Sequence, residues 1–437
     1  MVVAFLSVGR LPRRSTEKRR GYKASILMTV VVLGPVVVLG PVSAVGAGAS
    51  LAQDVAQAWR RQHVPSPPNS DLEGVSCPTT TVCIAVGAED NRAPGPARPL
   101  IEAWSPAGWS DNRAPQPPLV AGGAGLASVA CPSAASCVAV GGDGTFAPDG
   151  HPFSEVLKAG TWHIVPTAKV TTAIPGSVLL SSVSCWAPTG CDAAGIYTSL
   201  EAGAGETIVE TFNGTTWSVL KTAGFADSAY FTSISCLPAT VPALCVAVGS
   251  KGGASASVPL VELANGTSFQ VVPVPPIHGA KTSVLTSVSC PQPSSCVAVG
   301  MAKAGPDGPS RAFSEVEDLH YWGIVSPAPP PVESGQGFDL IGVACPLTVS
   351  VCVAVGAAGT AGPSPVAEAE LLSPPSGALS GTSLGRWHVS ATLAPQLSGF
   401  NSVSCPLSYS PTTVTCTAVG YYQPGKNRAT QAMAARI

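Results

Sequence analysis

The chain has 437 residues, of which 45% are hydrophobic and only 11% are charged, with a net charge of -2. Residues 1–50 hold seven basic residues and one acid, which leaves 16 basic and 24 acidic residues in the body. Phosphate binding needs a basic face, so this acidic body argues against nucleic acid as a partner. The low charge is typical of sheets that are buried on both faces.

The N-terminal segment has the parts of a secretory signal. Basic residues within 10–23 precede a stretch without charge over 24–53, which contains the apolar run 26–38 and ends in small residues. This order predicts a signal peptide within residues 1–53. About 20 apolar residues can also span a bilayer, so an uncleaved anchor over residues 24–46 is the alternative. In both cases we expect the body to be secreted or held at the cell surface.

A repeat organises residues 54–437. The stretch from Ser76 through Cys77 and Cys83 to Gly87 occurs seven times in variant form. The first cysteines of successive copies are separated by 54, 54, 51, 54, 55 and 60 residues. A period near 50 is typical of the four-stranded blade of a kelch-type propeller, rather than of the shorter WD40 repeat.

Each unit reads as four strands. A first strand ends at the first cysteine, and a second begins at the second cysteine and ends in glycine, as in Cys296–Gly300. A third strand such as Thr207–Phe212 leads through Asn213-Gly214 to a fourth strand that begins with an aromatic, here Trp217. Asn-Gly favours a two-residue hairpin turn, because both central positions need a positive φ. The fold predicted is therefore all-β, a seven-bladed propeller of four-stranded blades.

The count of fourth strands predicts how the ring closes. Six cysteine pairs are followed by an aromatic-led fourth strand, but the pair Cys405–Cys416 is not. The missing strand is expected at the other end of the chain, in Ala58–Pro65, where Trp59 is the leftover aromatic. This segment should pair with Gln431–Ile437, so that the last blade is built from both termini and no sheet edge stays exposed.

The cysteines are expected to form structural disulfides, each within its own unit. Their short spacing across a turn places the two Cα atoms within bridging range, and an even count agrees with an oxidising compartment. Metal or redox chemistry is the alternative, although zinc ligands usually come as C-x₂₋₄-C and converge on one ion. The predicted pairs are Cys77 with Cys83, Cys131 with Cys137, Cys185 with Cys191, Cys236 with Cys245, Cys290 with Cys296, Cys345 with Cys352, and Cys405 with Cys416.

A glutamate recurs in the third strands and is expected to accept bonds from neighbouring donors. Acid–base catalysis is the alternative, but packing repeats from blade to blade whereas an active site breaks the symmetry. No histidine shows metal-ligand spacing, and we expect no metal and no cofactor. The glutamates are Glu102, Glu155, Glu210, Glu262, Glu315 and Glu370, with Gln431 in the seventh place.

The loops after the second strands differ most between units, and they supply the candidate ligand-binding residues. Loops on a rigid scaffold often carry binding sites. Polar turns without a ligand are the alternative, since Pro-Asp-Gly turns are common. The candidates are Asp90, Arg92, Asp149, His151, Asp307 and Arg428; no catalytic residue is predicted.

The unit S-V-S-C-P…C-V-A-V-G resembles that of secreted bacterial repeat proteins of uncharacterised activity, over about residues 54–437. The resemblance implies a propeller similar to the kelch and sialidase types. The double glycine of kelch repeats is absent, and Gly214–Trp217 matches only the end of the sialidase Asp-box turn. An arginine triad and a free cysteine for a copper site are also missing, so no catalytic residue carries over.

We therefore predict a secreted or surface-tethered propeller that acts as a binding module, with a polysaccharide or an extracellular protein as partner. A carbohydrate-active enzyme, hydrolase or lyase, is the alternative. Two or more acids with an Arg, Tyr or His at the axial mouth would favour the enzyme. We expect a monomer whose only contact with a membrane is the N-terminal segment.

Overall fold

The computed structural model describes residues 59–437, with gaps at 90–95, 118–122, 144–149, 170–175, 200–204, 239, 241–242, 254, 265, 306–307, 319–320, 326–336, 347–350, 361–364, 374–385, 394–396, 407–414 and 426–427. The predicted signal or anchor segment lies outside the described residues. Among the described residues, no helix is long and apolar enough to cross a membrane.

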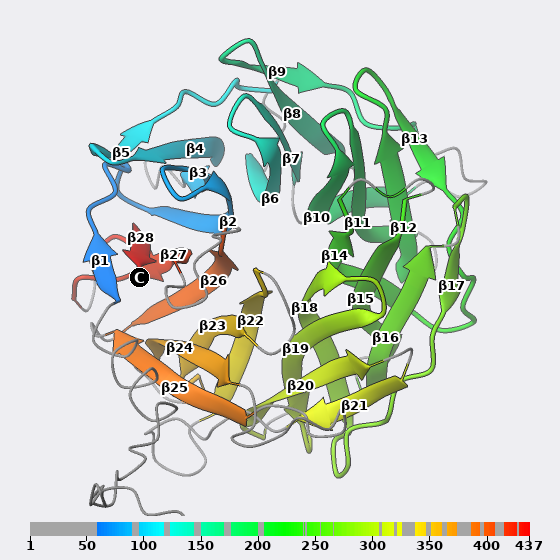
Figure 1. Cartoon of the computed structure of the whole chain (residues 1–437). Coiled ribbons are helices and arrows are strands. Elements are labelled where there is room, and N and C mark those ends of the chain that lie inside the picture. Colours follow the sequence, from blue (N-terminus) through cyan, green and yellow to red (C-terminus); the bar gives the residue numbers. More distant parts are fainter. Residues whose placement is uncertain are drawn as a thin grey trace, which may run out of the picture. The chain divides into compact units, whose positions relative to one another are not determined.

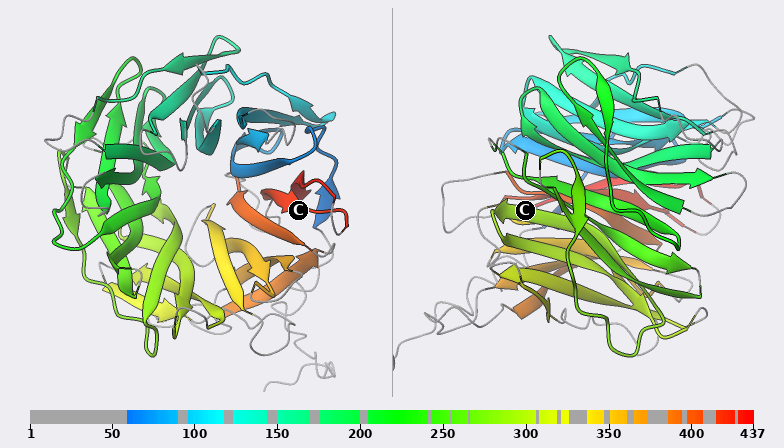
Figure 2. Two further views of the ribbon diagram at one scale, coloured as in Figure 1. Left: turned by 180° about the vertical axis from the view of Figure 1, so that it is seen from behind. Right: turned by 90° about the vertical axis from the view of Figure 1, so that its right-hand side faces the viewer.

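The described part of the chain contains 28 strands in seven antiparallel sheets of four, arranged as a ring (Figures 1 and 2). Blade 1 contains β2 (Ser70–Thr79), β3 (Val82–Glu89), β4 (Arg98–Ser105) and β5 (Gly108–Asp111). Blade 2 contains β6 (Ala124–Ser133), β7 (Ser136–Asp143), β8 (Pro152–Lys158) and β9 (Thr161–Val165). Blade 3 contains β10 (Gly176–Ala187), β11 (Gly190–Ser199), β12 (Gly205–Phe212) and β13 (Trp217–Leu220). Blade 4 contains β14 (Ala229–Cys236), β15 (Cys245–Gly253), β16 (Ala256–Ala264) and β17 (Phe269–Val271).

Blade 5 contains β18 (Thr282–Gln292), β19 (Ser295–Lys303), β20 (Ser310–Asp318) and β21 (Tyr321–Val325). Blade 6 contains β22 (Phe338–Ala344), β23 (Cys352–Ala358), β24 (Val366–Ser373) and β25 (Arg386–Leu393). Blade 7 contains β26 (Ser398–Ser404), β27 (Thr417–Tyr422), β28 (Gln431–Arg436) and, from the other end of the chain, β1 (Arg60–Gln62). Figure 1 shows the first strand of each blade innermost and the fourth at the rim. The predicted all-β, seven-bladed propeller is confirmed.

The seventh blade is closed by both ends of the body, as the strand count predicts. Strand β1 pairs with β28 in the register Arg60 to Arg436 and Gln62 to Ala434. Trp59 is buried, and its indole N–H donates to the hydroxyl of Ser390 in blade 6 at 3.1 Å. The closing strand therefore joins its own sheet through the backbone and the preceding blade through its aromatic side chain.

The motif glycine, which the sequence places at the end of each second strand, lies inside that strand in the structure, and it is there for a steric reason. Each first strand carries a bulge, such as that between Leu72 and Gly74, which pushes the preceding carbonyl toward the second strand. A Cβ on Gly87 would lie 2.1 Å from the Asp71 carbonyl oxygen, and one on Gly249 would lie 2.0 Å from that of Tyr230. A side chain cannot occupy this place without displacing backbone, so the repeat keeps glycine there.

The two serines of the repeat bind adjacent blades together. In the pattern S-V-S-C, each hydroxyl accepts a hydrogen bond from a backbone N–H in the first strand of the next blade. Ser182, for example, accepts from Ile234 at 3.2 Å, and Ser184 accepts from Cys236 at 2.9 Å. The other eight donor–acceptor pairs are Val183–Ser128, Val288–Ser233, Val343–Ser287, Val75–Ser402, Cys131–Ser76, Cys290–Ser235, Cys345–Ser289 and Cys77–Ser404.

Apolar side chains fill the remaining space between blades. Each core cluster combines residues from two neighbouring blades, as where Ile84 and Val86 of blade 1 pack with Leu126 and Phe153 of blade 2. Valine and alanine in the second strands are almost completely buried. Blades so closely stacked leave room only for small or branched side chains, which explains the low charge of the sequence.

All seven predicted disulfides are present, each within its own unit, with Cα–Cα distances of 3.9–4.2 Å. Each joins the first and second strands directly across the hairpin, as in the paired residues Cys185 and Cys191. The bridges therefore lie at the end of each blade that is opposite to the loops after the second strands.

Candidate functional site

The repeated glutamates lie in the blade interiors, and five of them carry a raised pKa. All six are fully buried. The Ser66 hydroxyl donates to Glu102 at 3.0 Å, and backbone N–H groups of Ala168 and Ala223 donate to Glu210 and Glu262 at 2.8 and 3.1 Å. Each donor lies in the connection that enters the blade of its glutamate. Burial raises the pKa of Glu102, Glu210 and Glu262 to about 7.

Glu155 and Glu315 depart from the expectation that neighbouring donors bind every glutamate. Neither carboxyl has a hydrogen-bond partner among the described residues, and burial raises the pKa of each to about 8. The sequence explains why the donor is lost. Ala168, the donor to Glu210, follows the fourth-strand aromatic of the preceding blade at a fixed distance. At the same distance from the corresponding aromatics, the connections to Glu155 and Glu315 have Pro115 and Pro275. Proline has no N–H to donate. These acids are therefore buried and protonated at neutral pH.

The seventh place of the glutamate series was assigned to Gln431, and this assignment is wrong. The glutamates pair with an alanine of the second strand, as Glu102 does with Ala85. In blade 7 the equivalent alanine, Ala418, pairs with Ala435, whereas Gln431 pairs with Tyr422. The short last strand was aligned by its first residue rather than by its register. Blade 7 thus has no carboxyl at this position.

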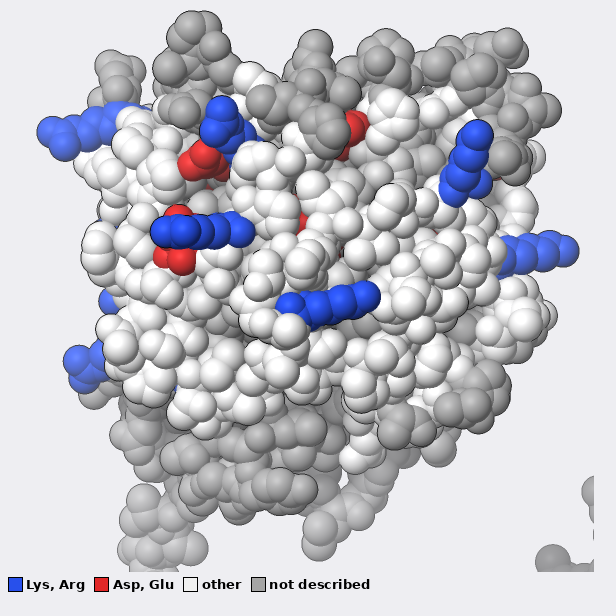
Figure 3. Space-filling model, turned by 90° about the horizontal axis from the view of Figure 1, so that it is seen from above, with Lys and Arg blue, Asp and Glu red and all other residues white. Residues whose placement is uncertain are grey.

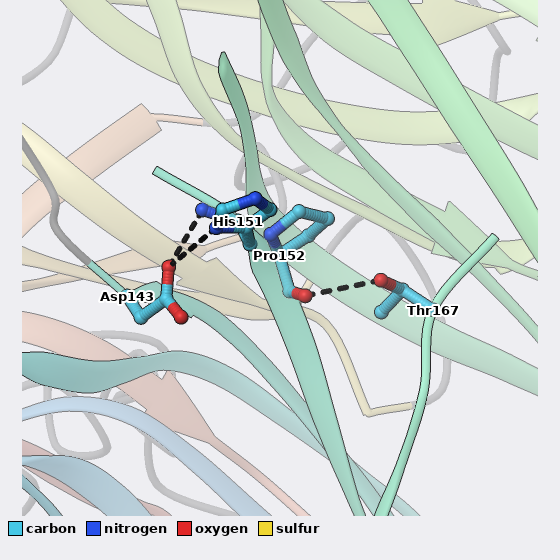
Figure 4. Close-up of polar contacts among 4 residues, drawn as sticks. All are labelled: Asp143, His151, Pro152 and Thr167. Atoms are coloured by element: carbon cyan, nitrogen blue, oxygen red, sulfur yellow. Dashed lines mark hydrogen bonds and ion pairs between the residues drawn. The ribbon is translucent and has the colours of Figure 1, made fainter. Parts of the chain in front are cut away.

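Four of the predicted loop residues, Asp90, Arg92, Asp149 and Asp307, lie outside the described residues. His151 is largely exposed; its backbone N–H donates to Asp143 Oδ1 at 2.6 Å, and its Nδ1 lies 3.5 Å from the same oxygen (Figure 4). The Arg428 backbone accepts from the Gln423 amide at 2.6 Å. His151 and Arg428 belong to blades 2 and 7, separated by blade 1, and their contacts are those of polar turns.

A groove lies on the loop side of blades 3 to 5, and sequence reasoning missed it. It consists of three adjoining cavities of about 560, 380 and 280 Å³. The first two share Gly252, Ser257 and Ser283, and the last two share Lys251 and Val258. The groove therefore runs from the first strands of blades 4 and 5, near the axis, along β16 to the rim of blade 4.

Hydroxyl groups dominate the inner part of this groove. Tyr230 is hydrogen-bonded to the side chain of Ser250, whose own hydroxyl donates to the Ser283 carbonyl at 2.9 Å. Ser257 and Ser283 exchange bonds of 3.3 Å. Because these hydroxyls already have backbone partners, their orientation is fixed before any ligand arrives. The described hydroxyl residues of the inner cavity are Thr198, Ser228, Tyr230, Ser250, Ser257, Thr282 and Ser283.

Three lysines give the groove a local positive charge. Lys303 lines the inner cavity, Lys281 the middle one, and Lys251 the middle and outer ones. Lys251 Nζ lies 5.8 Å from the ring centroid of Phe225, which forms part of the same wall. Among the described lining residues, Asp227 is the one acid. Basic residues therefore outnumber acidic ones in the groove, whereas acidic residues outnumber basic ones in the body as a whole.

A pair of acidic residues lies on the opposite side of the ring, and sequence reasoning missed this pair as well. Asp71 and Glu73 are in β2, and their carboxyl groups share a hydrogen bond. The side chain of Glu73 reaches solvent, but protein atoms surround its carboxyl group. The desolvation of this carboxyl, and after it the charge of Asp71, raises the pKa of Glu73 to about 7. Burial and the two carboxylates raise the pKa of Tyr421 in blade 7.

The acid pair and the groove occupy equivalent places in different blades. In each of these blades, one first-strand residue pairs with the residue that follows the second-strand glycine. This first-strand residue is Asp71 in blade 1, Tyr230 in blade 4 and Val284 in blade 5. Asp339 holds this place in blade 6. The inner rim on the loop side therefore breaks the sevenfold symmetry, with acids over blades 6 and 1 and hydroxyls over blade 4. Aligning the repeats column by column is the signal that could have found these residues.

Comparisons with known proteins add no argument to the fold that the structure itself shows. No family model and no curated protein matches the chain. Among solved structures, the WD40 β-propeller domain of Doa1 is 9% identical with a TM-score of 0.47, covering 86% of this chain and 96% of that chain. An ulvan lyase of a polysaccharide lyase family is 9% identical with a TM-score of 0.49, covering 85% and 95%. An α-L-arabinofuranosidase from Fusarium graminearum is 11% identical with a TM-score of 0.41, covering 86% and 97%. At these values the likenesses carry no argument about activity.

Proposed function

We propose that this propeller is a secreted binding module that holds an extended anionic polysaccharide in the groove over blades 3 to 5. The observation that carries the proposal is the combination, in one groove, of seven hydroxyl residues, several of them held by hydrogen bonds, with three lysines. Fixed hydroxyls exchange hydrogen bonds with sugar hydroxyls, and lysines attract carboxylate or sulfate groups along the chain.

The shape of the groove supports a polymer rather than a small molecule. Three adjoining cavities extend from the inner strands to the rim, and the outer one is lined by Val258, Leu260, Val271 and Val274. An inner wall with hydroxyls and an apolar outer wall suit sugar rings, which have polar edges and apolar faces. On the side shown in Figure 3, a few basic side chains, two of them beside acidic ones, are spread over a mostly uncharged surface. The lysine groove is thus a local feature of an acidic body.

The compartment supports a ligand outside the cytoplasm. Seven disulfides persist in oxidising surroundings and are rare in reducing ones. We also propose that the N-terminal segment exports the body, and that it is then either cleaved or kept as an anchor over residues 24–46. The body is proposed to be a monomer that does not bind nucleic acid.

A second candidate function, a carbohydrate-active enzyme, is favoured by the acid pair. Asp71, Glu73 and Tyr421 meet the criterion of two acids with a tyrosine at the inner rim. With a pKa of about 7, Glu73 could act as a general acid beside Asp71. Glu73→Gln should then abolish any turnover of a bound polysaccharide while leaving its affinity unchanged.

The test of the binding function is titration of the purified body with polysaccharides of matched length that are neutral, uronic-acid-bearing or sulfated. We expect the two anionic classes to bind more tightly, with an affinity that falls as salt rises. The double variant Lys281→Ala/Lys303→Ala should weaken anionic binding about tenfold and leave neutral binding nearly unchanged. Equal affinity for neutral and anionic polymers, or no effect of the double variant, would contradict the proposal. Capture of a protein instead of a glycan would also contradict it.

A further inference from the structure

One blade carries a buried acid at a position where the other blades have none. Asp192 follows Cys191 in β11 and is 2% exposed. The residue that follows the second cysteine is aliphatic in five blades and threonine in the seventh: Ile84, Val138, Val246, Val297, Val353 and Thr417. A buried ionisable group is costly unless it is paired or hydrogen-bonded.

The carboxyl of Asp192 lies against the disulfide of the next blade. Its Oδ2 is 3.4 Å from Sγ of Cys245, which is bridged to Cys236. The indole N–H of Trp186 donates to Oδ1 at 3.4 Å, and the Thr211 side chain is also hydrogen-bonded to the carboxyl. Burial raises the pKa of Asp192 despite these two donors. Asp192, Cys236 and Cys245 are grouped as metal ligands would be, but the bridged sulfurs offer no thiolate.

The contact places a proton donor at the sulfur that must leave when the bridge is opened. Cys236 is 6% exposed and Cys245 is fully buried, so an incoming thiolate meets Cys236 first. Displacement then leaves negative charge on Cys245, which is fully buried. A buried thiolate is unstable, and breaking the bridge is slow unless a neighbour protonates it.

We propose that Cys236–Cys245 is a thiol–disulfide exchange site, with Asp192 as its general acid and base, and with a low-molecular-weight or protein thiol as the reaction partner. The thiolate attacks Cys236 Sγ, the bond between Cys236 and Cys245 breaks, and Cys245 takes the proton of the Asp192 carboxyl. The products are a mixed disulfide at Cys236, a Cys245 thiol and an Asp192 carboxylate. In the reverse step Asp192 takes the proton back, and the Cys245 thiolate expels the partner thiol. No oxidant is consumed, because each step breaks one disulfide bond and forms another.

The other bridges of the same molecule are matched controls. First cysteines have similar exposure, 5% for Cys77, 9% for Cys131 and 7% for Cys290, so access to the incoming thiol is comparable. The core clusters group the second cysteines of five other bridges with an aliphatic residue of the preceding blade, whereas Cys83 Sγ lies 3.5 Å from the Thr417 hydroxyl. The Cys405–Cys416 bridge closes a longer loop than Cys236–Cys245 but faces Val353, which controls for loop length.

The test is brief exposure of the folded body to excess reduced glutathione, acid quenching, alkylation of free thiols and peptide mass mapping of all seven bridges. We expect glutathione on Cys236 and alkylation of Cys245, at a rate about 10–100-fold above that of the bridges facing aliphatic residues. Asp192→Asn should remove this advantage and leave the rates of the other six bridges unchanged. Asp192→Val, which restores the side chain found in the equivalent blades, should do the same.

Thermal melting and far-UV circular dichroism establish that both variants are folded. If neither folds, the rank order of the seven bridges in the unmodified protein still decides the question. The proposal fails if Cys236–Cys245 opens no faster than Cys131–Cys137, if glutathione is found on Cys245, or if Asp192→Asn leaves the rate unchanged. Opening of Cys405–Cys416 at the same high rate would assign the advantage to loop length and overturn the role of Asp192.

Discussion

The two ends of each blade differ in how closely the seven repeats agree. At the end where the disulfides lie, every blade has the same bridge, the same small second strand and, in most blades, the same serine bonds to its neighbour. At the other end, equivalent positions hold an acid in blade 1, tyrosine in blade 4 and valine in blade 5. One end repeats because it makes the ring, and the other varies because nothing in the ring fixes its side chains.

This comparison teaches where a change should affect folding and where it should affect only binding. Substitutions at the repeated end remove contacts between blades and should lower stability. Substitutions at the variable end, where cavities open to solvent, should leave stability nearly unchanged. The predictions below test this division, starting from the largest expected effect.

Removal of the closing strand should have the largest effect. Deleting residues 54–68 removes β1 and Trp59, which exposes the edge of β28 and opens the contact with Ser390. We expect a loss of several kcal/mol, comparable with the net stability of a domain, and therefore a body that does not fold or melts far lower. Deleting residues 1–50 is the control and should leave the melting temperature unchanged. Equal melting of both truncations would show that the ring closes in another way.

The buried acids Glu155 and Glu315 should make stability fall as pH rises. Between about pH 4.5 and 8 both are protonated in the folded state and ionised in the unfolded state, so higher pH favours unfolding. Above about 8 the dependence should level off. Glu155→Gln/Glu315→Gln should flatten the slope and be more stable than the unmodified protein at pH 9, by an amount of the order of a few kcal/mol. Parallel stability curves for the two proteins would contradict the account.

A methyl group on a second-strand glycine should be more harmful than one in the groove. Gly249→Ala places a Cβ at 2.0 Å from the Tyr230 carbonyl oxygen, whereas a Cβ on Gly253 meets nothing within 4 Å. We expect the first substitution to cost about 3 kcal/mol and the second to be within about 0.5 kcal/mol of neutral. Denaturant unfolding measures both. Similar costs at the two positions would remove the distinction between positions that repeat and positions that vary.

The serine bonds between blades should have the smallest effect on stability. Ser184→Ala leaves the Cys236 N–H without its partner and should cost about 1–2 kcal/mol. Blade 2 has Ala130 at the equivalent place, so Ala130→Ser should supply a bond to the next blade and gain a few tenths of a kcal/mol. A destabilising Ala130→Ser would show that the hydroxyl does not fit this junction.

The sequence was sufficient for the parts of the molecule that repeat. The period of the cysteines predicts seven blades, and the leftover Trp59 predicts how the ring closes, since both follow from counting. Gln431 was misplaced because a register in a short strand is decided by its partner strand, not by its first residue. The unbonded Glu155 and Glu315 were foreseeable from Pro115 and Pro275, but only once the donor of Glu210 was known.

The candidate sites were not predicted, for a physical reason. The groove joins side chains from three blades, such as Thr198, Tyr230 and Lys303, which are far apart in the chain. Gly252 lines two of its cavities with a φ of 115°, a backbone conformation that favours glycine. The proximity of Asp192 to the next blade's disulfide likewise follows from stacking. Such contacts become visible only when the blades are placed side by side.

The most direct test of the central claim, that the groove holds an anionic polysaccharide, is to fill the groove without disturbing the fold. Gly253 lines the inner cavity and its Cβ would enter open space, so Gly253→Trp should fold normally and block binding. Gly425→Trp is the matched control, since a Cβ there meets only the Arg428 side chain, in the corresponding loop of blade 7. By titration calorimetry with a uronic-acid polymer, we predict at least about a tenfold loss of affinity for Gly253→Trp and none for Gly425→Trp. Unchanged binding by a folded Gly253→Trp would contradict the account.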